Sequence, residues 1–484
     1  MPSIPKVLRL PQATLPQGGT CALVILATAV LSCCSLPAPP PTAAFAGPAY
    51  VVLGSNAQAI ARVVVDGAAC PNLEVDGATL PMQTRVAAGT APLRGKQEKA
   101  SAFALQVCEA TLPQGAHAAS VLGRSLPLPR DQPRRIVVLG DTGCRIKKAE
   151  NAYQDCSDSG AWPFAAVAAA AAREHPDLVL HVGDYHYREN PCPPDQRCAG
   201  SPWGYGWDAW DADFFTPAAR LLAAAPWVMA RGNHELCSRA GQGWFRLLDA
   251  APYSARRNCD DIAADDLADF TAPYAVPLGD GWQLIIFDSA RASRPLDRSR
   301  APDAQTFDRY VADLDAVAAL AAAPGMHSIF VSHHPALGFA IDAGAAPRFG
   351  TAALLEPMKQ RNGTHYLPAG IEFSLHGHVH TFEAIDFASG QPAAIVAGHG
   401  GDLLDRDLAG PPAATYPGAE GIVIASAAQT SRFGYLVLER GAAGWHIDAR
   451  GLDGALLAHC ELGTRRVDCP AVAGGVHSLR PAAP

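Results

Sequence analysis

The chain has 484 residues, 49% of them hydrophobic and 17% charged, so it can bury a sizeable core and form more than one domain. Its formal net charge of −8 argues against a protein that binds nucleic acid through bulk positive charge. A local site for an anion stays open, because bound metal ions carry charge that the sequence does not count.

Residues 1–46 have the features of an export leader followed by a linker. Basic residues precede an apolar run from Ala22 to Leu31, which is too short to span a membrane and is typical of a signal peptide. Two cleavage sites compete: Val30-Leu31-Ser32-Cys33 resembles a lipobox, and Ala44-Phe45-Ala46 is a small-residue site. We expect an exported protein of the periplasm or cell envelope, and a lipid on Cys33 would attach it to a membrane.

Cysteine usage agrees with export, because disulfides persist in oxidising compartments. Of the 13 cysteines, Cys21, Cys33 and Cys34 lie in the leader, and an even number follows. Spacing cannot fix the connectivity, but the simplest expectation pairs sequential neighbours. These pairs are Cys70 with Cys108, Cys144 with Cys156, Cys192 with Cys198, Cys237 with Cys259, and Cys460 with Cys469.

Residues 47–130 contain short runs of β-type residues, among them Tyr50–Leu53 and Ala61–Val65, which glycine and proline separate. They show no long helical period. We therefore predict a small all-β domain here, and the proline-rich stretch Leu126–Pro133 marks its end.

Strands and helices alternate over residues 134–450, a pattern typical of an α/β domain. The predicted strands are Arg135–Asp141, Asp177–Val182, Pro226–Asn233, Trp282–Asp288, His327–Ser332, Ile371–Leu375, Ala393–Ala397 and Phe433–Glu439. Predicted helices cover Trp162–Glu174 and Phe307–Ala323, with Thr306 as the expected N-cap of the second. Residues 451–484 form a tail that contains the last cysteine pair.

Five short polar motifs follow predicted strands directly. They are Gly140-Asp141-Thr142-Gly143, Gly183-Asp184-Tyr185-His186-Tyr187, Gly232-Asn233-His234-Glu235, Ser332-His333-His334-Pro335 and His376-Gly377-His378-Val379-His380. Ligands of α/β sheets bind at the carboxyl ends of the strands, so motifs far apart in sequence can share one site there. We therefore predict that the five motifs converge.

The residue types in these motifs are metal ligands. Carboxylate, amide oxygen, imidazole and phenolate suit hard or borderline metal ions. Two such ions about 3.5–4 Å apart can clamp a phosphoryl group and produce a nucleophilic hydroxide at moderate pH. Because two cations repel at that distance, the pair needs an anionic bridge, and we predict that Asp184 supplies it.

With these motifs in this order, the chain from Arg135 to Glu439 resembles the calcineurin-like metallophosphoesterases and, more narrowly, the purple acid phosphatases. The wider superfamily usually has Asp-x-His in the first motif, whereas this chain has Asp141-Thr142-Gly143. The purple branch carries a tyrosine in Gly-Asp-x-x-Tyr instead, and Tyr187 occupies that position. The resemblance implies an α/β fold, a four-layer α/β/β/α sandwich behind the small N-terminal all-β domain.

The resemblance also implies two bound metal ions. One, expected to be Fe(III), takes Asp141, Asp184, Tyr187 and His380. The other, divalent Zn, Fe or Mn, takes Asp184, Asn233, His333 and His378. His234 is not a ligand in this scheme: it contacts phosphate oxygens and helps to protonate the leaving alcohol, so His234 and Asp184 are the expected catalytic residues.

Several neighbouring residues have open roles. We prefer His333 to His334 as the ligand because it precedes the proline by two, and a strand bulge would exchange Tyr187 with Tyr185, which otherwise packs. Three histidines either contact substrate, surround the ligands or simply belong to their loops. They are His186, His334 and His399.

The expected function is hydrolysis of small phosphate monoesters by in-line attack of a metal-bound hydroxide. One alternative is a phosphodiesterase or nucleotidase, for which aromatic residues after Tyr187 would stack a base or simply pack. These are Trp203, Tyr205, Trp207 and Trp210. An alternative of another class is a non-catalytic envelope binding protein with a degenerate site. No nucleic-acid polymer is expected as a partner.

Overall fold

The computed structural model describes residues 46–67, 69–95, 97–341, 346–441 and 444–481, which belong to one compact unit. The predicted leader, both cleavage sites and Cys33 lie outside the described residues. None of the described helices is both long enough and apolar enough to cross a bilayer.

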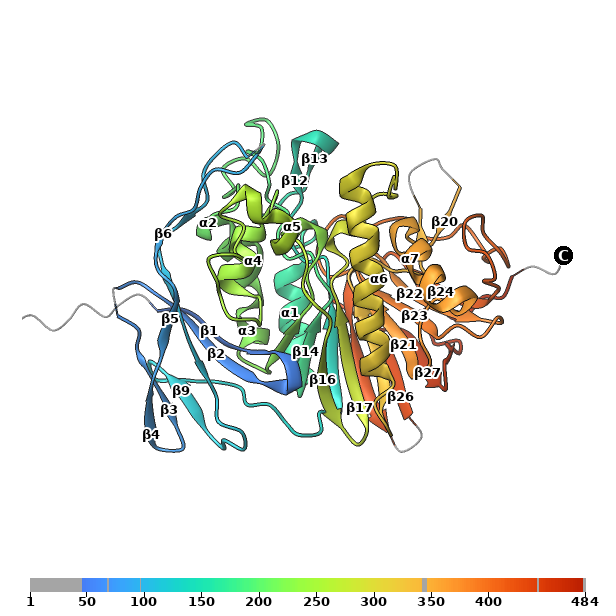
Figure 1. Cartoon of the computed structure of the whole chain (residues 1–484), viewed down its shortest axis with the longest axis horizontal. Helices are drawn as coiled ribbons and strands as arrows, with labels where there is room; N and C mark the ends of the chain where they lie inside the picture. The colour runs from blue at the N-terminus through green and yellow to red at the C-terminus, as the bar shows by residue number, and fades with distance from the viewer. Residues whose placement is uncertain (1–45, 68, 96, 342–345, 442–443, 482–484) are drawn as a thin grey trace, which may run out of the picture. The chain divides into compact units, whose positions relative to one another are not determined.

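Two sheets form the centre of the unit (Figure 1). Within the described residues the first has 11 strands, in the spatial order β28 (Arg466–Asp468), β27 (Leu456–Gly463), β26 (Gly444–Gly451), β25 (Gly434–Gly441), β11 (Arg135–Leu139), β14 (Leu178–His181), β15 (Trp227–Met229), β1 (Ala46–Leu53), β2 (Ala59–Val65), β8 (Gln106–Thr111) and β5 (Gln83–Val86). The second has seven described strands, in the order β16 (Tyr274–Gly279), β17 (Trp282–Phe287), β18 (His327–Ser332), β21 (Ile371–His376), β23 (Ala393–Ala397), β22 (Phe382–Phe387) and β24 (Ile424–Thr430).

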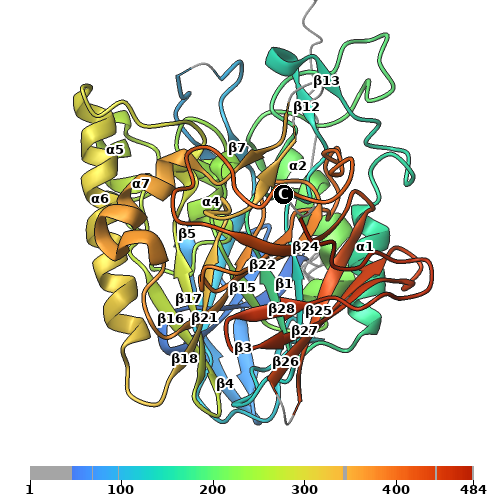
Figure 2. The same ribbon diagram turned by 90° about the vertical axis from the view of Figure 1, so that its right-hand side faces the viewer.

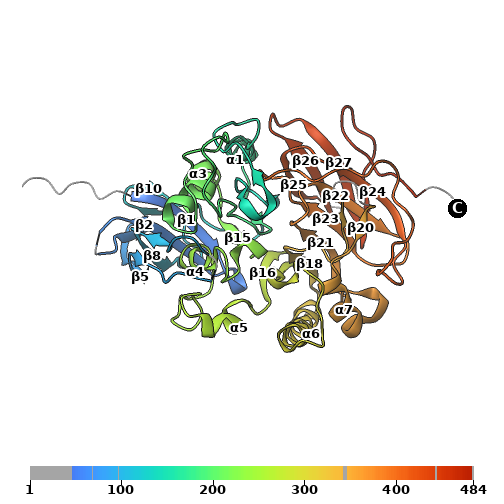
Figure 3. The same cartoon turned by 90° about the horizontal axis from the view of Figure 1, so that it is seen from above.

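Helices cover the outer face of each sheet, so the layers run helix, sheet, sheet, helix (Figures 1 and 3). Helices α1 (Phe164–Arg173) and α3 (Thr216–Leu222) share a core with one face of β11, β14 and β15. Helices α6 (Ala301–Ala321) and α7 (Ala352–Asn362) share another with β17 and β18. The predicted four-layer α/β fold is thereby confirmed.

The third core lies between the sheets and contains alternate residues of their central strands, such as Val138 of β11 and Ile329 of β18. Because these strands are buried on both faces, their sequences are nearly continuous apolar runs rather than alternating ones. Each fully buried aliphatic side chain contributes roughly 1.5–3 kcal/mol, so this double-sided burial holds the strand ends in fixed positions.

The N-terminal region is largely made of strands, as predicted, but four of them continue the first sheet. Strand β1 pairs in parallel with β15 through Val52 and Trp227, and β2, β8 and β5 follow beyond it. A smaller sheet contains β10 (Arg124–Ser125), β9 (Ala119–Val121), β3 (Asn72–Val75) and β4 (Ala78–Pro81). The boundaries of a domain at residues 47–130 stay a prediction.

Two buried arginines of these strands donate hydrogen bonds to carbonyl oxygens at the C-terminal end of helix α4 (Gly241–Leu247). Arg85 donates to the carbonyl oxygens of Phe245 at 2.7 Å and Asp249 at 2.9 Å, and Arg62 donates to that of Leu247 at 2.9 Å. Both arginines also pair with Glu109. Cations at a helix C-terminus satisfy its last carbonyls and its dipole, so the N-terminal strands fix the position of α4.

Replacing Arg85 by Ala is expected to lower the free energy of unfolding by about 3–5 kcal/mol, because Glu109 and several carbonyls lose a buried partner. Urea unfolding followed by circular dichroism would measure it. Arg130→Ala is the matched control: its side chain is 71% exposed and pairs with Asp177, so the change should be below about 0.5 kcal/mol. Equal midpoints for the two variants would contradict the capping role.

The predicted sequential disulfides are confirmed. Among the described residues the structure contains five: Cys70–Cys108, Cys144–Cys156, Cys192–Cys198, Cys237–Cys259 and Cys460–Cys469. Such a set is typical of a protein that folds in an extracellular or otherwise oxidising compartment.

The predicted start of the long helix was wrong. Helix α6 begins at Ala301, six positions before the predicted Phe307, and carries Pro302 in its first turn. Proline is favoured there because the first N–H groups of a helix have no partner within it. Thr306 is therefore not a cap; its hydroxyl donates to the carbonyl oxygen of Pro302 at 2.9 Å.

Candidate metal centre

The five motifs converge where the central strands of both sheets end. Strands β11, β14 and β15 are parallel neighbours in the first sheet, and β18 and β21 are parallel neighbours in the second. Backbone bonds join the segments that follow them: Asp141 N–H donates to Gly183 O at 3.0 Å, and Gly377 N–H donates to His333 O at 2.9 Å. Residues distant in sequence thus form one site.

One group of side chains surrounds the hydroxyl of Tyr187. This oxygen lies 3.0 Å from Oδ1 of Asp141, 3.0 Å from Oδ2 of Asp184 and 3.3 Å from Nε2 of His380. The imidazole of His380 is also 3.4 Å from Oδ1 of Asp141. These four residues are the set predicted for the first metal ion.

A second group surrounds Nε2 of His333. This nitrogen lies 3.1 Å from Oδ1 of Asn233 and 3.1 Å from Oδ2 of Asp184. The rings of His333 and His378 have centroids 5.2 Å apart. Atom Oδ2 of Asp184 therefore borders both groups, as a carboxylate shared by two ions must.

The donor atoms fit metal ions in spacing and in kind. Ligands about 2.1 Å from one ion lie about 3.0 Å apart at right angles and about 3.4 Å apart in a tetrahedron. The distances around Tyr187 and His333 span 3.0–3.4 Å. Two groups of residues in the site have possible ligand atoms that all lie within 4.8 Å of one another. One is Asp141, Asp184 and His333, and the other is His333, His334 and His378. The site is thus able to hold two metal ions.

The electrostatics of the site call for positive charge. Burial alone would lower the pKa of His333 and of His380, but neighbouring carboxylates raise these values to about 9 and about 10. Burial and three carboxylates, Asp141, Asp184 and Asp402, raise the pKa of Tyr187 well above its usual value. A cation would balance the charge of the carboxylates and allow the phenol of Tyr187 to ionise. The donor set therefore suits bound metal ions.

Three of the predicted ligands have strained backbone conformations. Asp141, Asp184 and His378 have φ angles of +56°, +59° and +70°, in the left-handed region that side chains rarely adopt. Such conformations cost of order 1–3 kcal/mol each and persist where the surroundings impose them. Gly232 is required next to this turn, because a Cβ there would lie 2.1 Å from Oδ1 of Asp184.

His234 lies beside both groups without joining either. Its ring packs on that of Tyr187, with centroids 3.8 Å apart, and its Nε2 is 3.8 Å from Oδ2 of Asp184. Its Nδ1 lies 2.9 Å from the carbonyl oxygen of His186 and 3.1 Å from Oε1 of Glu189. Burial, followed by the charge of Arg239, lowers the pKa of His234 to about 4.

Glu235 ties two motifs together, a role that the sequence did not reveal although the residue belongs to the third motif. Its buried carboxylate accepts backbone N–H bonds from Gly232 and Asp184, both at 3.1 Å, and from Tyr185 at 2.9 Å. Burial, and then the charge of Asp184, raises its pKa to about 8. Glu235 therefore fixes the turn that presents Asp184.

The structure locates Tyr185 and His334, two of the residues whose roles the sequence leaves open. Tyr185 packs in the core and donates to Ala230 O at 2.9 Å, so Tyr187 alone reaches the carboxylates. His334 lies 3.3 Å from the hydroxyls of Ser289 and Ser293, but its ring also approaches that of His378, at 4.0 Å.

The other two histidines are buried away from solvent. The ring of His186 packs against Tyr205 and Trp210, and neither ring nitrogen finds a partner among the described residues. The ring of His399 packs near Phe382, and burial lowers its pKa to about 3. The structure gives neither residue a surface that a substrate could contact.

Two arginines that sequence reasoning missed border the site. The guanidinium of Arg145 lies 4.9 Å from the ring centre of Tyr187 and pairs with the buried Asp402. Arg239 pairs with Glu189 and lies 2.6 Å from Nδ1 of His234. Their side chains remain 16% and 17% exposed. The only sequence signal was their position a few residues after the first and third motifs.

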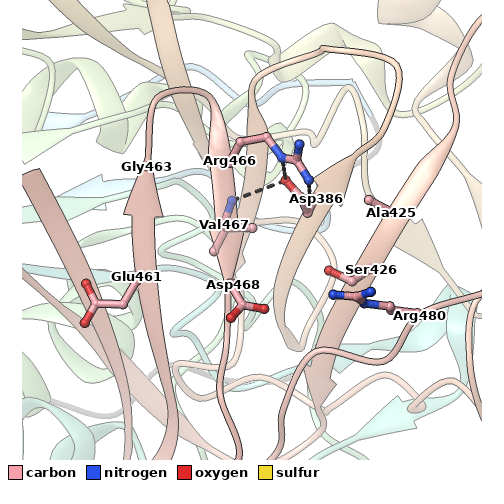
Figure 4. A pocket seen from close by; sticks show the side chains of 9 residues that line it. All are labelled: Asp386, Ala425, Ser426, Glu461, Gly463, Arg466, Val467, Asp468 and Arg480. Carbon is pink, nitrogen blue, oxygen red and sulfur yellow. Dashed lines mark hydrogen bonds and ion pairs between the residues drawn. The ribbon is translucent and has the colours of Figure 1, made fainter.

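A surface hollow of about 530 Å³ lies elsewhere, between the ends of β22, β24, β27 and β28 (Figure 4). Its wall contains Asp386 and Arg466, which form two hydrogen bonds of 2.6 Å, and the nearby Arg480. None of the predicted ligands lines it. The hollow is therefore separate from the metal centre.

Comparisons with known proteins agree with this geometry. The family model for calcineurin-like phosphoesterases matches residues 134–382. The structure of purple acid phosphatase PPD1 from yellow lupin (Lupinus luteus) seeds aligns over 85% of this chain and 73% of its own, with 17% identity and a TM-score of 0.50. Identity at this level shows a common fold alone.

Two further solved structures align less well. One is described as PhoD (12% identity, 89% of this chain, 93% of that chain, TM-score 0.49). The other is GAP50, the anchor in the inner membrane complex of Plasmodium (13%, 69%, 89%, TM-score 0.39). A search of curated proteins found no match.

Proposed function

Since the chain belongs to the calcineurin-like phosphoesterase family, we propose that it is an exported dinuclear metal enzyme of the purple acid phosphatase type that hydrolyses small phosphate monoesters. The observation that carries this proposal is the position of Oδ2 of Asp184, 3.0 Å from the hydroxyl of Tyr187 and 3.1 Å from Nε2 of His333. A carboxylate there can serve two ions at once.

The residues of the two groups would hold the ions. Asp141, Tyr187 and His380 would bind one; Asn233, His333 and His378 would bind the other; Asp184 would be shared. We assign Fe(III) to the first because a phenolate is its characteristic ligand here, and Zn, Fe or Mn to the second. Bound ions would offset phosphoryl charge and lower the pKa of water, so that a nucleophile exists at moderate pH.

The chain's own side chains orient the reaction. Nδ1 of His234 lies beside His186 O, Oε1 of Glu189 and the Arg239 guanidinium, and these neighbours hold the ring with Nε2 toward the side of Asp184. From there Nε2, once protonated, would contact a phosphoryl oxygen and pass that proton to the departing alcohol. Glu235 keeps Asp184 in its strained turn, and the packing of His234 on Tyr187 keeps the imidazole in place.

A monoester is favoured over a diester by the charges around the site. Arg145 borders it, and a monoester dianion presents more unsubstituted oxygens to such a donor than a diester does. Of the aromatic residues considered as a base-stacking platform, Tyr205 and Trp210 are buried against His186. A nucleotidase or phosphodiesterase is therefore the weaker candidate.

One purified sample tests the proposal. We expect about two metal ions per chain, a visible absorption band from tyrosinate bound to iron, and faster turnover of a chromogenic monoester than of the matching diester. Tyr187→Phe should lose the band because it lacks the phenolate. Tyr185→Phe is the matched control and should keep the band, since its hydroxyl bonds Ala230 in the core.

The outcomes separate the alternatives. A colourless, active enzyme with zinc or manganese alone would overturn the iron assignment and leave phosphoesterase chemistry standing. A faster diester reaction would favour the phosphodiesterase. A protein that binds no metal and turns over neither ester would favour the non-catalytic binding protein.

Export rests on separate support. The disulfides fit an oxidising compartment, and the proposal adds the leader at residues 1–46 and, through Cys33, attachment to a membrane. Small phosphorylated compounds are the partners proposed for the site.

A further inference from the structure

Arg239 contacts His234 and two of the residues that surround its ring. Its guanidinium pairs with Glu189, lies 2.6 Å from Nδ1 of His234, and donates through Nη1 to the carbonyl oxygen of Asn233 at 3.3 Å. Glu189 in turn lies 3.1 Å from Nδ1 of His234 and accepts from the hydroxyl of Tyr205 at 3.1 Å. One guanidinium thus contacts the imidazole itself and two residues beside it, Glu189 and Asn233.

The charges explain why an arginine is needed there. The carboxylate of Glu189 is only 9% exposed, and a buried charge without a partner is costly. The guanidinium of Arg239 supplies that partner. With Glu189 fixed by a planar guanidinium, Nδ1 of His234 has three neighbours at fixed positions: Oε1 of Glu189, the carbonyl oxygen of His186 and Nη2 of Arg239.

Arg239 is itself held by the N-terminal region. The described residues of the loop between β6 (Gly89–Thr90) and β7 (Ala102–Phe103), here the β6–β7 loop, run beside helices α2 (Trp207–Trp210) and α4 (Figures 1 and 2). Within it, Gln97 donates through Nε2 to the carbonyl oxygen of Arg239 at 3.1 Å.

Further contacts anchor the loop on the N-terminal side of Gln97. Oε1 of Gln97 accepts from the N–H of Arg94 at 3.2 Å, and the guanidinium of Arg94 pairs with Asp265. Gln242 at the start of α4 donates to the carbonyl oxygen of Pro92 at 2.9 Å. The loop therefore has a defined position against the segment that carries Asn233 and His234.

We propose that Arg239 is a positioning residue for His234, and that the β6–β7 loop of the N-terminal region, through Gln97, holds Arg239 in place. The inference rests on the proposed function, because it assigns the orientation of the imidazole to the phosphoryl-transfer site. It makes the N-terminal strands part of the machinery that sets turnover.

The test compares Arg239→Met, Arg239→Lys and Gln97→Met in the full, metal-loaded chain with a chromogenic monoester. Groups that orient active-site residues typically affect activity about 10–100-fold. We expect kcat to fall by about that factor in Arg239→Met, less in Gln97→Met, with KM changed less than about 3-fold. Arg239→Lys should recover part of kcat, because it keeps the charge but not the planar fork. Leu93→Ala, in the same loop and 54% exposed in the parent protein, should match the wild type.

A second readout does not depend on turnover. In the zinc-loaded protein, proton NMR should show a slowly exchanging ring N–H resonance of His234, assigned by its loss in His234→Ala. We expect the resonance to persist in Leu93→Ala and to broaden or vanish in Arg239→Met and Gln97→Met.

Unchanged kcat and an unchanged resonance in Arg239→Met would overturn the inference. If Arg239→Met does not fold, Gln97→Met decides in the same way. A wild type that hydrolyses no phosphate ester but shows the expected pattern of resonances would overturn the proposed function and leave the positioning role of Arg239 standing.

Discussion

Replacing Asp184 by Asn is expected to remove most bound metal and to lower phosphoesterase activity by at least about 10³-fold. Changes to groups that only surround metal ligands typically cost about 10–100-fold, and a carboxylate shared by two ions should cost more. Its Oδ2 lies 3.0 Å from the Tyr187 hydroxyl and 3.1 Å from Nε2 of His333, so both ions would lose the same anionic ligand. Metal content by mass spectrometry and kcat/KM for a monoester would measure it.

The control must separate loss of metal from loss of fold. Asp386→Asn replaces another buried carboxylate, one that pairs with Arg466 away from the metal centre. We expect it to keep metal and activity even if it unfolds at a lower urea concentration. An Asp184→Asn variant that retains two ions and near wild-type turnover would contradict the bridging role.

The convergence of the five motifs could be predicted because each follows a strand that is buried on both faces. Such strands are visible in sequence as apolar runs, and the residue after the run lies at the carboxyl end of the sheet. Asp141 after β11 and Asp184 after β14 are examples, and their backbones are bonded through Gly183. The Gly-Asp-x-x-Tyr spacing also singled out Tyr187, which reaches the carboxylates, rather than Tyr185, which packs.

Long-range pairing left no such trace in the sequence. The parallel pairing of β1 with β15 joins Val52 to Trp227, and no local feature of either strand indicates which strand it will pair with. The same holds for Arg145 and Asp402, or Arg239 and Glu189, whose pairing depends on how loops meet in space. The sequence therefore predicted a small all-β domain in the N-terminal region, although four strands of that region extend the first sheet.

His234→Ala is expected to retain both metal ions and to lower kcat by about 10²–10⁴-fold, the range typical of general acid catalysis. The imidazole is not placed as a ligand: its Nε2 is 3.8 Å from Oδ2 of Asp184, and its Nδ1 faces His186 O and Glu189. If Nε2 supplies a proton to the departing alcohol, the loss should be greater for an alkyl phosphate than for a nitrophenyl phosphate, whose leaving group needs no proton. Parallel kcat measurements with the two esters would show the difference.

The size of that difference distinguishes two roles for the same imidazole. Equal losses for both esters would restrict His234 to stabilising phosphoryl charge, and loss of metal in the variant would make it a ligand after all. His446→Ala serves as the control, because this histidine is 30% exposed on strand β26 and pairs with Glu439. A drop in kcat confined to His234→Ala, with metal retained, would place the proton donor at the point where the rings of Tyr187 and His234 pack together.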